Sequence, residues 1–195
     1  MYIDIEDKDP LWLKDKGDHF YKRHDFMSAI NAYSKAIKID NGFLFCRLNR
    51  GTTFMRMRQF QACVDEMDDI EQLINAIPQN EIAEEFDFYT KIRGRMTLRR
   101  AAALAWMSQF DAAIADYEKA AMFKGVFSEH EISVMQHDCS VVKIRKQSQE
   151  VKLQGDIFFA RNMLNESLEQ YMKAIELDPT NEYALSNIGV IYLKR

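Results

Sequence analysis

The chain has 195 residues, of which 47% are hydrophobic and 29% charged, and its formal net charge is −4. This length suffices to bury a sizeable core, and the mildly acidic balance argues against nucleic acid as the main partner, because phosphate binding needs a basic excess. The sequence contains no run of 18 apolar residues and no apolar region in its start, MYIDIEDKDP, so it predicts neither a transmembrane helix nor a signal peptide. Three widely spaced cysteines without a CxxC pair favour a reducing compartment, the cytoplasm, and no zinc site.

Four glycines mark a repeated helical unit. They stand 34 residues apart in two pairs, in the similar phrases KGDHFY, RGTTFM, QGDIFF and IGVIYL: Gly17 and Gly51, then Gly155 and Gly189. Small, large and small residues follow Gly17 at 12, 16 and 19 positions, as Ala29, Tyr33 and Ala36. Two helices approach closely only where side chains are small, and a large residue fills the gap beside them. The period therefore predicts stacked helical hairpins.

The same steps recur in the other copies. From Gly155 they reach Ser167, Tyr171 and Ala174, and from a fourth position, Ala101, they reach Ala113, Tyr117 and Ala120. From Gly51 they reach Cys63, Met67 and Ile70. We therefore expect the second copy to pack less regularly than the others.

Two insertions interrupt the period. The interval from Gly51 to Ala101 is 50 residues, and the pattern from Glu81 to Met107 predicts one long helix that starts acidic and turns basic, as the helix dipole favours. The second insertion, residues 125–149, predicts another helix, which either stands alone or continues into the following repeat. We expect it to pack across the end of the preceding repeats.

The two ends of the chain fit the repeat least. Residues 1–9 contain Tyr2, Ile3 and Ile5 in a pattern that fits either the end of a strand or an unstructured arm. Residues from 182 onward form a half-repeat without a partner helix. A terminal repeat needs a polar outer face, yet Ile188, Val190 and Ile191 are apolar. This last helix is expected either to cap the stack or to mark a point where the chain has been cut.

Catalytic motifs are not found. The sequence has no GxxxxGK, GxGxxG or GxSxG, and therefore no recognisable phosphate loop or nucleophile elbow. His130 and His137 share a helix face, but they lie two turns apart rather than the one turn usual for a helical ligand pair, so we interpret them as packing or solvent-facing. No catalytic residue, metal ligand or cofactor is predicted, and the protein is not expected to be an enzyme.

The period, the small–large–small steps and the phrases KAIKID and KAIELDP resemble the tetratricopeptide repeat family over most of the chain. The resemblance implies an all-α fold, a right-handed α–α superhelix of helical hairpins, with repeats at 10–43, 44–77, 94–127 and 148–181. The expected organisation is an arm at 1–9, three repeats at 10–127 with an extended first helix in the third, a capping or linking helix at 128–149, and one and a half repeats at 150–195.

Part of this family binds the acidic C-terminal tail of seventy- and ninety-kilodalton heat-shock chaperones through a five-position carboxylate clamp. Four positions match here. LKDKGD places Lys14 at the lysine position, LNRG places Asn49 at the second asparagine position, and RMTLRR supplies the basic pair, Arg95 and Arg99. Cations and an amide that converge in one groove would donate charge-assisted hydrogen bonds to carboxylates, each worth about 1.5–3 kcal/mol. The alternative is that these are ordinary solvated charges on helix faces.

The fifth position departs from the pattern. Asp18 stands where the family has its first asparagine, and a carboxylate there repels a ligand carboxylate. We therefore expect weakened or retuned binding, or a different tail. Lys152, Asp156 and Asn187 echo the pattern in the fourth repeat, but no following repeat supplies a basic pair, so we interpret them as ancestry rather than as a second site.

The resemblance predicts a co-chaperone-like adaptor that binds a heat-shock chaperone tail through Lys14, Asp18, Asn49, Arg95 and Arg99. DPLWLKDKGDHFYKRHDFMSAINAYSKAI and VVKIRKQ are also similar to tetratricopeptide co-chaperones that assist the assembly of axonemal dynein arms, over about residues 8–150. Those carry a CS (p23-like) domain before the repeats, which these residues lack. This likeness implies dynein-assembly clients and a cytoplasmic, cilium-associated location. The alternative is a structural scaffold that holds another protein without recognising a tail.

Overall fold

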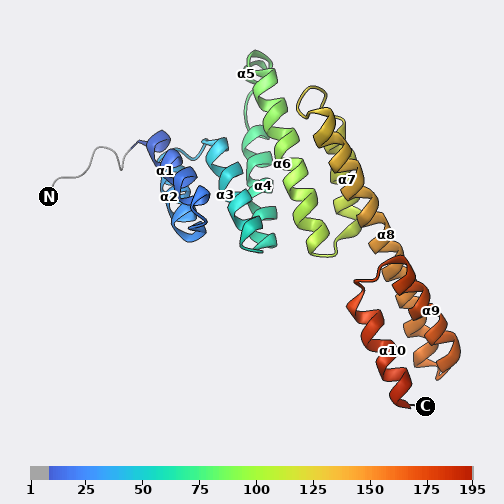
Figure 1. The fold of residues 1–195 in the computed structure, drawn as a ribbon. Helices are drawn as coiled ribbons and strands as arrows, with labels where there is room; N and C mark the ends of the chain where they lie inside the picture. Colours follow the sequence, from blue (N-terminus) through green and yellow to red (C-terminus); the bar gives the residue numbers. More distant parts are fainter. Residues whose placement is uncertain (1–8, 195) are drawn as a thin grey trace. The chain divides into compact units, whose positions relative to one another are not determined.

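A computed structural model describes residues 9–194, which form α-helices joined by short turns without any strand (Figure 1). The prediction of an all-α fold is confirmed. The question of a strand or an arm at Tyr2, Ile3 and Ile5 lies outside the described residues. The helices are α1 (Pro10–Lys22), α2 (Phe26–Ile39), α3 (Leu44–Arg56), α4 (Phe60–Asn75), α5 (Gln79–Glu84), α6 (Phe86–Trp106), α7 (Phe110–Ala121), α8 (Glu129–Ala160), α9 (Leu164–Leu177) and α10 (Glu182–Lys194).

The chain divides into two compact units, Met1–Met135 and Gln136–Arg195, and α8 belongs to both. In the first unit, α1 packs on α2, α3 on α4, and α6 on α7, and neighbouring hairpins stack through the pairs α2–α3 and α4–α6. In the second unit, α9 packs on α10. No helix within residues 9–194 combines the length and the apolar character needed to cross a bilayer.

Each hairpin turns at a residue in the left-handed backbone region. The four turn residues have φ of 58–62° and none is glycine: His24, Arg58, Ser108 and Asn162. In the first hairpin the N–H of Asp25 donates to the carbonyl of Phe20 at 3.0 Å, and the other three turns repeat this bond at 2.9–3.0 Å. This is the Schellman arrangement, which satisfies carbonyls at a helix end. The same turn geometry thus sets the entry of every second helix.

The glycines allow close helix packing inside the hairpins. A Cβ added to Gly17 would lie 2.5 Å from Cε1 of Tyr33, and one added to Gly155 would lie 2.5 Å from Cε1 of Tyr171. Both tyrosines are 1% exposed. At Gly51 the occupant is the end of the Met67 side chain instead. The packing that the 34-residue period predicts is therefore present at these three positions.

The prediction of one helix from Glu81 to Met107 is wrong. The backbone leaves helical geometry at Glu85, where φ is −116° and ψ is 36°, and this residue ends α5 and precedes α6. Glu81, Glu84 and Glu85 place like charges three and four positions apart, which destabilises a continuous helix. Burial of Ile82 holds the short α5 in place while Phe86, at the start of α6, is 64% exposed.

The second insertion joins the following repeat. Residues 129–160 form one helix of 32 residues, so the continuity that the pattern left open is present. A capping box begins this helix: the backbone N–H of Ser128 donates to Glu131 at 2.9 Å, and the N–H of Glu131 donates to the Ser128 hydroxyl at 3.3 Å. The division of the chain into an arm, repeats and a separate cap at 128–149 stays a prediction.

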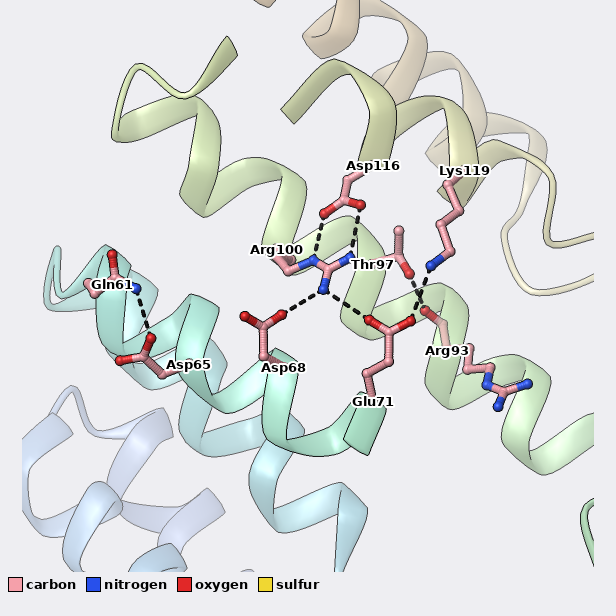
Figure 2. A network of polar contacts seen from close by, with 9 residues as sticks. All are labelled: Gln61, Asp65, Asp68, Glu71, Arg93, Thr97, Arg100, Asp116 and Lys119. Atoms are coloured by element: carbon pink, nitrogen blue, oxygen red, sulfur yellow. Dashed lines mark hydrogen bonds and ion pairs between the residues drawn. The ribbon is translucent and has the colours of Figure 1, made fainter. Parts of the chain in front are cut away.

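A network of charges joins three helices of the first unit (Figure 2). The Arg100 guanidinium donates to both carboxylate oxygens of Asp116 on α7, at 2.7 and 3.0 Å. It also donates to Asp68 at 2.6 Å and to Glu71 at 3.0 Å, both on α4. Asp116 is only 7% exposed, and the Arg100 guanidinium compensates its buried carboxylate.

Replacing Arg100 by methionine is expected to lower the free energy of unfolding of the first unit by about 2–3 kcal/mol, because it leaves the buried Asp116 carboxylate unpaired. Arg93→Met is the control, since Arg93 makes one exposed bond to Asn75, at 3.1 Å, and should change stability by less than about 0.5 kcal/mol. Urea unfolding followed by circular dichroism measures both. Equal losses in the two variants would contradict a structural role for the network.

Candidate functional site

Three of the five predicted residues converge in the first unit around the Asp18 carboxylate. Lys14, one turn earlier on α1, donates to Oδ2 of Asp18 at 2.8 Å and to Asp15 at 2.9 Å. Asn49 on α3 donates to Oδ1 of Asp18 at 2.9 Å, and the Tyr33 hydroxyl on α2 donates to the same oxygen at 2.6 Å. Asp18 therefore joins α1, α2 and α3. It accepts hydrogen bonds from Lys14 and Asn49, which the resemblance predicts to bind a ligand.

Asp18 is ionised at neutral pH. Burial would raise its pKa, but the hydrogen bonds from Lys14 and Tyr33 and the Lys14 charge outweigh burial, and the net effect lowers the pKa. The hydrogen bond to Asp18 raises the pKa of Lys14. Burial and the neighbouring Asp18 raise the pKa of Tyr33, so its hydroxyl stays protonated and remains a donor. Asp18 therefore places a carboxylate, paired with the Lys14 ammonium, where the resemblance leads us to expect a ligand carboxylate.

A pocket of about 150 Å³ opens beside this cluster. Two of the residues that line it, Asp18 and Asn49, are predicted site residues. The others were not predicted to belong to a site: Tyr21, Lys22, Tyr33 and Thr52. Helical spacing could have predicted two of them, because Lys22 and Thr52 lie one turn after Asp18 and Asn49, at four and three residues. Tyr33 was identified only as a packing residue, and it is both.

Arg99 connects α6 to this pocket. Its Nε donates to the hydroxyl of Thr52 at 2.6 Å. Burial and the neighbouring positive charge of Arg95 lower the pKa of Arg99, but an arginine stays charged at neutral pH. Within residues 9–194 no carboxylate pairs with this guanidinium. Arg99 is therefore a half-buried cation whose charge is not balanced by a neighbouring acid.

Arg95 lies one turn before Arg99, but its head group has an internal partner. One terminal nitrogen pairs with the Glu131 carboxylate of the α8 capping box, and the other donates to the carbonyl of Val126 at 3.3 Å. The guanidinium also lies 4.8 Å from the ring centroid of Phe127. Hydrogen bonds from Arg95 and Ser128 lower the pKa of Glu131 to about 2, so this pair persists at neutral pH. The structure thus does not bring Arg95 to the Asp18 cluster.

The second unit repeats the cluster atom for atom. Lys152 donates to Oδ2 of Asp156 at 2.7 Å, while Tyr171 and Asn187 donate to Oδ1 at 2.8 and 3.1 Å. These residues follow Lys14, Asp18, Tyr33 and Asn49 by 138 positions each. The echo includes Tyr171, which the sequence analysis matched with Tyr33 as a packing residue but not as a hydrogen-bond donor to the aspartate. Because it forms in a repeat without a basic pair, the cluster has a structural role that does not depend on a ligand.

Other reactive groups of the described chain are packed away. No three histidine, cysteine or acidic side chains between residues 9 and 194 gather in a way that could hold a metal ion. All three cysteines are buried, and burial raises the pKa of Cys46 and Cys63 to about 12 each. These thiols are therefore protonated at neutral pH and serve the helix packing.

The family model described as TPR repeat matches residues 155–195. Hsp70-Hsp90 organizing protein 3 of Arabidopsis thaliana is 26% identical over 201 residues, which cover 93% of this chain and 33% of the relative. Dynein axonemal assembly factor 4 of Pongo pygmaeus is 28% identical over 116 residues, which cover 59% of this chain and 26% of the relative. This chain therefore spans about a third or less of the length of these curated relatives.

A solved structure shares the fold. The first TPR of Spaghetti (RPAP3), bound to the HSP90 peptide SRMEEVD, superposes with a TM-score of 0.51 at 20% identity, covering 67% of this chain and 93% of that one. Three of the four glycines that mark the 34-residue period, Gly17, Gly51 and Gly155, pack as it requires, and the four turns at His24, Arg58, Ser108 and Asn162 share one geometry. Together with the match over residues 155–195, these findings show that the chain is built from helical hairpins like those of tetratricopeptide repeat proteins, the family that it resembles.

Proposed function

We propose that this chain is an adaptor whose α1, α3 and α6 bind the free C-terminus of an acidic peptide, of the kind that ends heat-shock chaperones. The observation that carries the proposal is Arg99, a half-buried cation beside the pocket with no acidic partner among the described residues. An uncompensated charge of this kind is stabilised when an anion binds. The organizing-protein relatives and the structure with SRMEEVD support this class of ligand.

The Asp18 cluster retains donors for such a ligand. The Lys14 ammonium has three hydrogens and uses two, on Asp15 and Asp18. The Asn49 amide has two hydrogens and uses one. Each can therefore donate one further bond to a peptide carboxylate while Asp18 stays in place. The charge of Asp18 opposes that carboxylate, so the affinity is expected to lie below that of a site with asparagine.

Titration of the full chain with SRMEEVD tests the proposal, using the free acid and the C-terminal amide. The amide is expected to bind at least about tenfold more weakly, and Arg99→Ala to cause a loss of similar size, since a charge-assisted bond contributes about 1.5–3 kcal/mol.

Glu131→Gln should strengthen binding because it releases Arg95. Lys14→Ala should weaken binding, whereas Lys152→Ala, at the matching position of the second unit, should not. Equal binding of acid and amide would refute tail recognition.

A scaffold that holds another protein without reading its tail is the second candidate. The observation in its favour is that carboxylates of the chain itself already occupy Lys14, Asn49 and Arg95. Partners that remain bound after Arg99→Ala would support it. The likeness to Dynein axonemal assembly factor 4 favours dynein-assembly complexes in the cytoplasm as the setting for either role.

A further inference from the structure

Four aromatic side chains form a patch on α3 and the start of α6. Phe45 on α3 meets Phe88 on α6 edge to face, with ring centroids 5.6 Å apart, and Phe88 meets Tyr89 in the same way at 5.0 Å. Phe86 begins α6 and is 64% exposed, while Phe45 is 48% exposed. We call these four residues the aromatic patch. Three of them lie in the insertion before the third repeat, so the 34-residue period does not account for them.

Other residues supply the core in this part of the chain. Ile82 of α5 and Ile92 of α6 are 7% and 1% exposed. In the first unit, α5 and the first turns of α6 extend past the neighbouring helices α3 and α4 (Figure 1). Proteins in water rarely gather exposed apolar side chains into one patch unless that patch binds something.

Acidic side chains accompany the aromatic patch. Glu84, Glu85 and Asp87 lie beside Phe86 in the sequence. Within residues 9–194 the carboxylates of these three residues form no ion pair and no hydrogen bond. Even the exposed Lys91, one turn after Asp87, does not pair with it. The patch therefore combines exposed rings with negative charge that the described part of the chain leaves uncompensated.

Two tryptophans elsewhere show how this chain treats comparable rings. Nζ of Lys16 lies 4.4 Å from the ring centroid of Trp12, and the Arg58 guanidinium lies 5.9 Å from that of Trp106, which is 56% exposed. Between residues 9 and 194 no cation lies in this way over a ring of the aromatic patch. Ring faces and carboxylates both attract cations, so the patch favours a positively charged ligand.

The arrangement fits several cations rather than one metal ion. No three histidine, cysteine or acidic side chains in the described residues gather closely enough to hold a metal. Carboxylates that are spread along α5 and the first turn of α6 match charges that are spread along another chain. Arginine and lysine supply such charges, and their methylene stems pack on aromatic rings.

We propose that the aromatic patch binds a basic segment of another polypeptide, in which arginine or lysine alternates with apolar residues. The cations lie over the ring faces and pair with Glu84 and Asp87, while the apolar residues cover Phe45 and Phe86. Exposed aromatic anchors of this kind contribute much of the binding energy in protein interfaces. The insertion thus adds a binding surface whose charge preference is opposite to that proposed for the pocket beside Asp18.

The test adds a short capped peptide of alternating arginine and leucine to the full isotope-labelled chain and follows the backbone amide NMR signals. We expect shifts concentrated at residues 44–48 and 84–92, and a dissociation constant at least about tenfold weaker for Phe86→Ser. Trp106→Ser removes a similarly exposed ring from the other end of α6. This matched control should bind the peptide as the parent does.

Charge and apolar contact are tested separately. Glu84→Gln combined with Asp87→Asn should weaken binding several-fold and reduce its dependence on salt, because a screened attraction is lost. Glu166→Gln combined with Glu176→Gln removes the same charge from exposed positions on α9 and should leave binding unchanged. A peptide with serine in place of leucine, or with glutamine in place of arginine, should bind much more weakly.

The proposal is overturned if the arginine–leucine peptide leaves the signals of residues 84–92 unmoved at millimolar concentration, or if the peptide with serine binds equally well. Sedimentation velocity supplies a further arm: self-association that Phe86→Ser abolishes would show that a second copy is the occupant and would overturn the assignment to another polypeptide. Binding of SRMEEVD should be the same in Phe86→Ser and the parent, so this inference and the proposed tail recognition fail separately.

Discussion

Replacing Asp18 by asparagine is expected to raise the affinity for the free-acid SRMEEVD peptide at least tenfold. The change removes a fixed negative charge from the pocket and releases Lys14 from its 2.8 Å ion pair. It also adds an amide donor beside Asn49 where the carboxylate could only accept. One further charge-assisted bond of about 1.5–3 kcal/mol corresponds to roughly a tenfold to hundredfold gain. Isothermal titration of both proteins measures it.

The second unit supplies the matched control. Asp156→Asn makes the same change in the same set of partners, Lys152, Tyr171 and Asn187, away from Arg99. It should leave the peptide affinity unchanged. A gain in both variants would show a general effect of net charge, and no gain in Asp18→Asn would place the ligand elsewhere than at the Asp18 cluster.

The same substitution separates binding from stability. Because the pKa of Asp18 is lowered in the fold, its ionised form contributes stability above the unfolded-state pKa of 3.8, and this contribution is lost as the pH falls through the folded-state pKa. Asp18→Asn should therefore lose a little stability at neutral pH and show a weaker dependence on pH in the acid range. Higher affinity together with lower stability would mark Asp18 as a residue that holds three helices at a cost to ligand binding.

Local patterns explain most of what the sequence predicted. Three of the four marked glycines pack against a large residue 16 positions later, because close approach of two helices depends on spacing along each helix. Lys14, Asp18 and Asn49 meet for the same reason, since they repeat at fixed offsets on neighbouring first helices. The period thus contains enough information to place side chains that share a hairpin or two successive hairpins.

The 34-residue period could not predict the contacts that the insertions make. The partner of Arg95, Glu131, lies 36 residues away in a segment with no repeat, so no spacing rule connects them. The helix break at Glu85 accompanies the burial of Ile82 on α5. Which side chain of α5 becomes buried is set by tertiary packing. Arg99 and Arg100 are adjacent in the sequence and of the same residue type. Arg99 nevertheless contacts Thr52 and Arg100 contacts Asp116, because they lie on different sides of α6.

Alanine substitution of the glycines of the second unit is expected to change stability in opposite directions. Gly155→Ala should lower the free energy of unfolding by about 1–3 kcal/mol, because the added Cβ would lie 2.5 Å from Cε1 and 2.6 Å from Cδ1 of Tyr171. That ring is buried and hydrogen-bonded to Asp156, so it cannot move aside freely. Gly189→Ala should raise the free energy of unfolding by about 0.5–1 kcal/mol, since alanine favours the helix and the added Cβ meets nothing.

Gly51→Ala in the first unit tests the reason for this difference. The group that its Cβ would meet is the terminal methyl of Met67, the far end of a flexible side chain, so the cost should be smaller than at Gly17, where the rigid ring of Tyr33 lies 2.5 Å away. Thermal unfolding of the four variants ranks them. If Gly189→Ala destabilised the second unit as much as Gly155→Ala, the space beside Gly189 would already be filled, contrary to the structure.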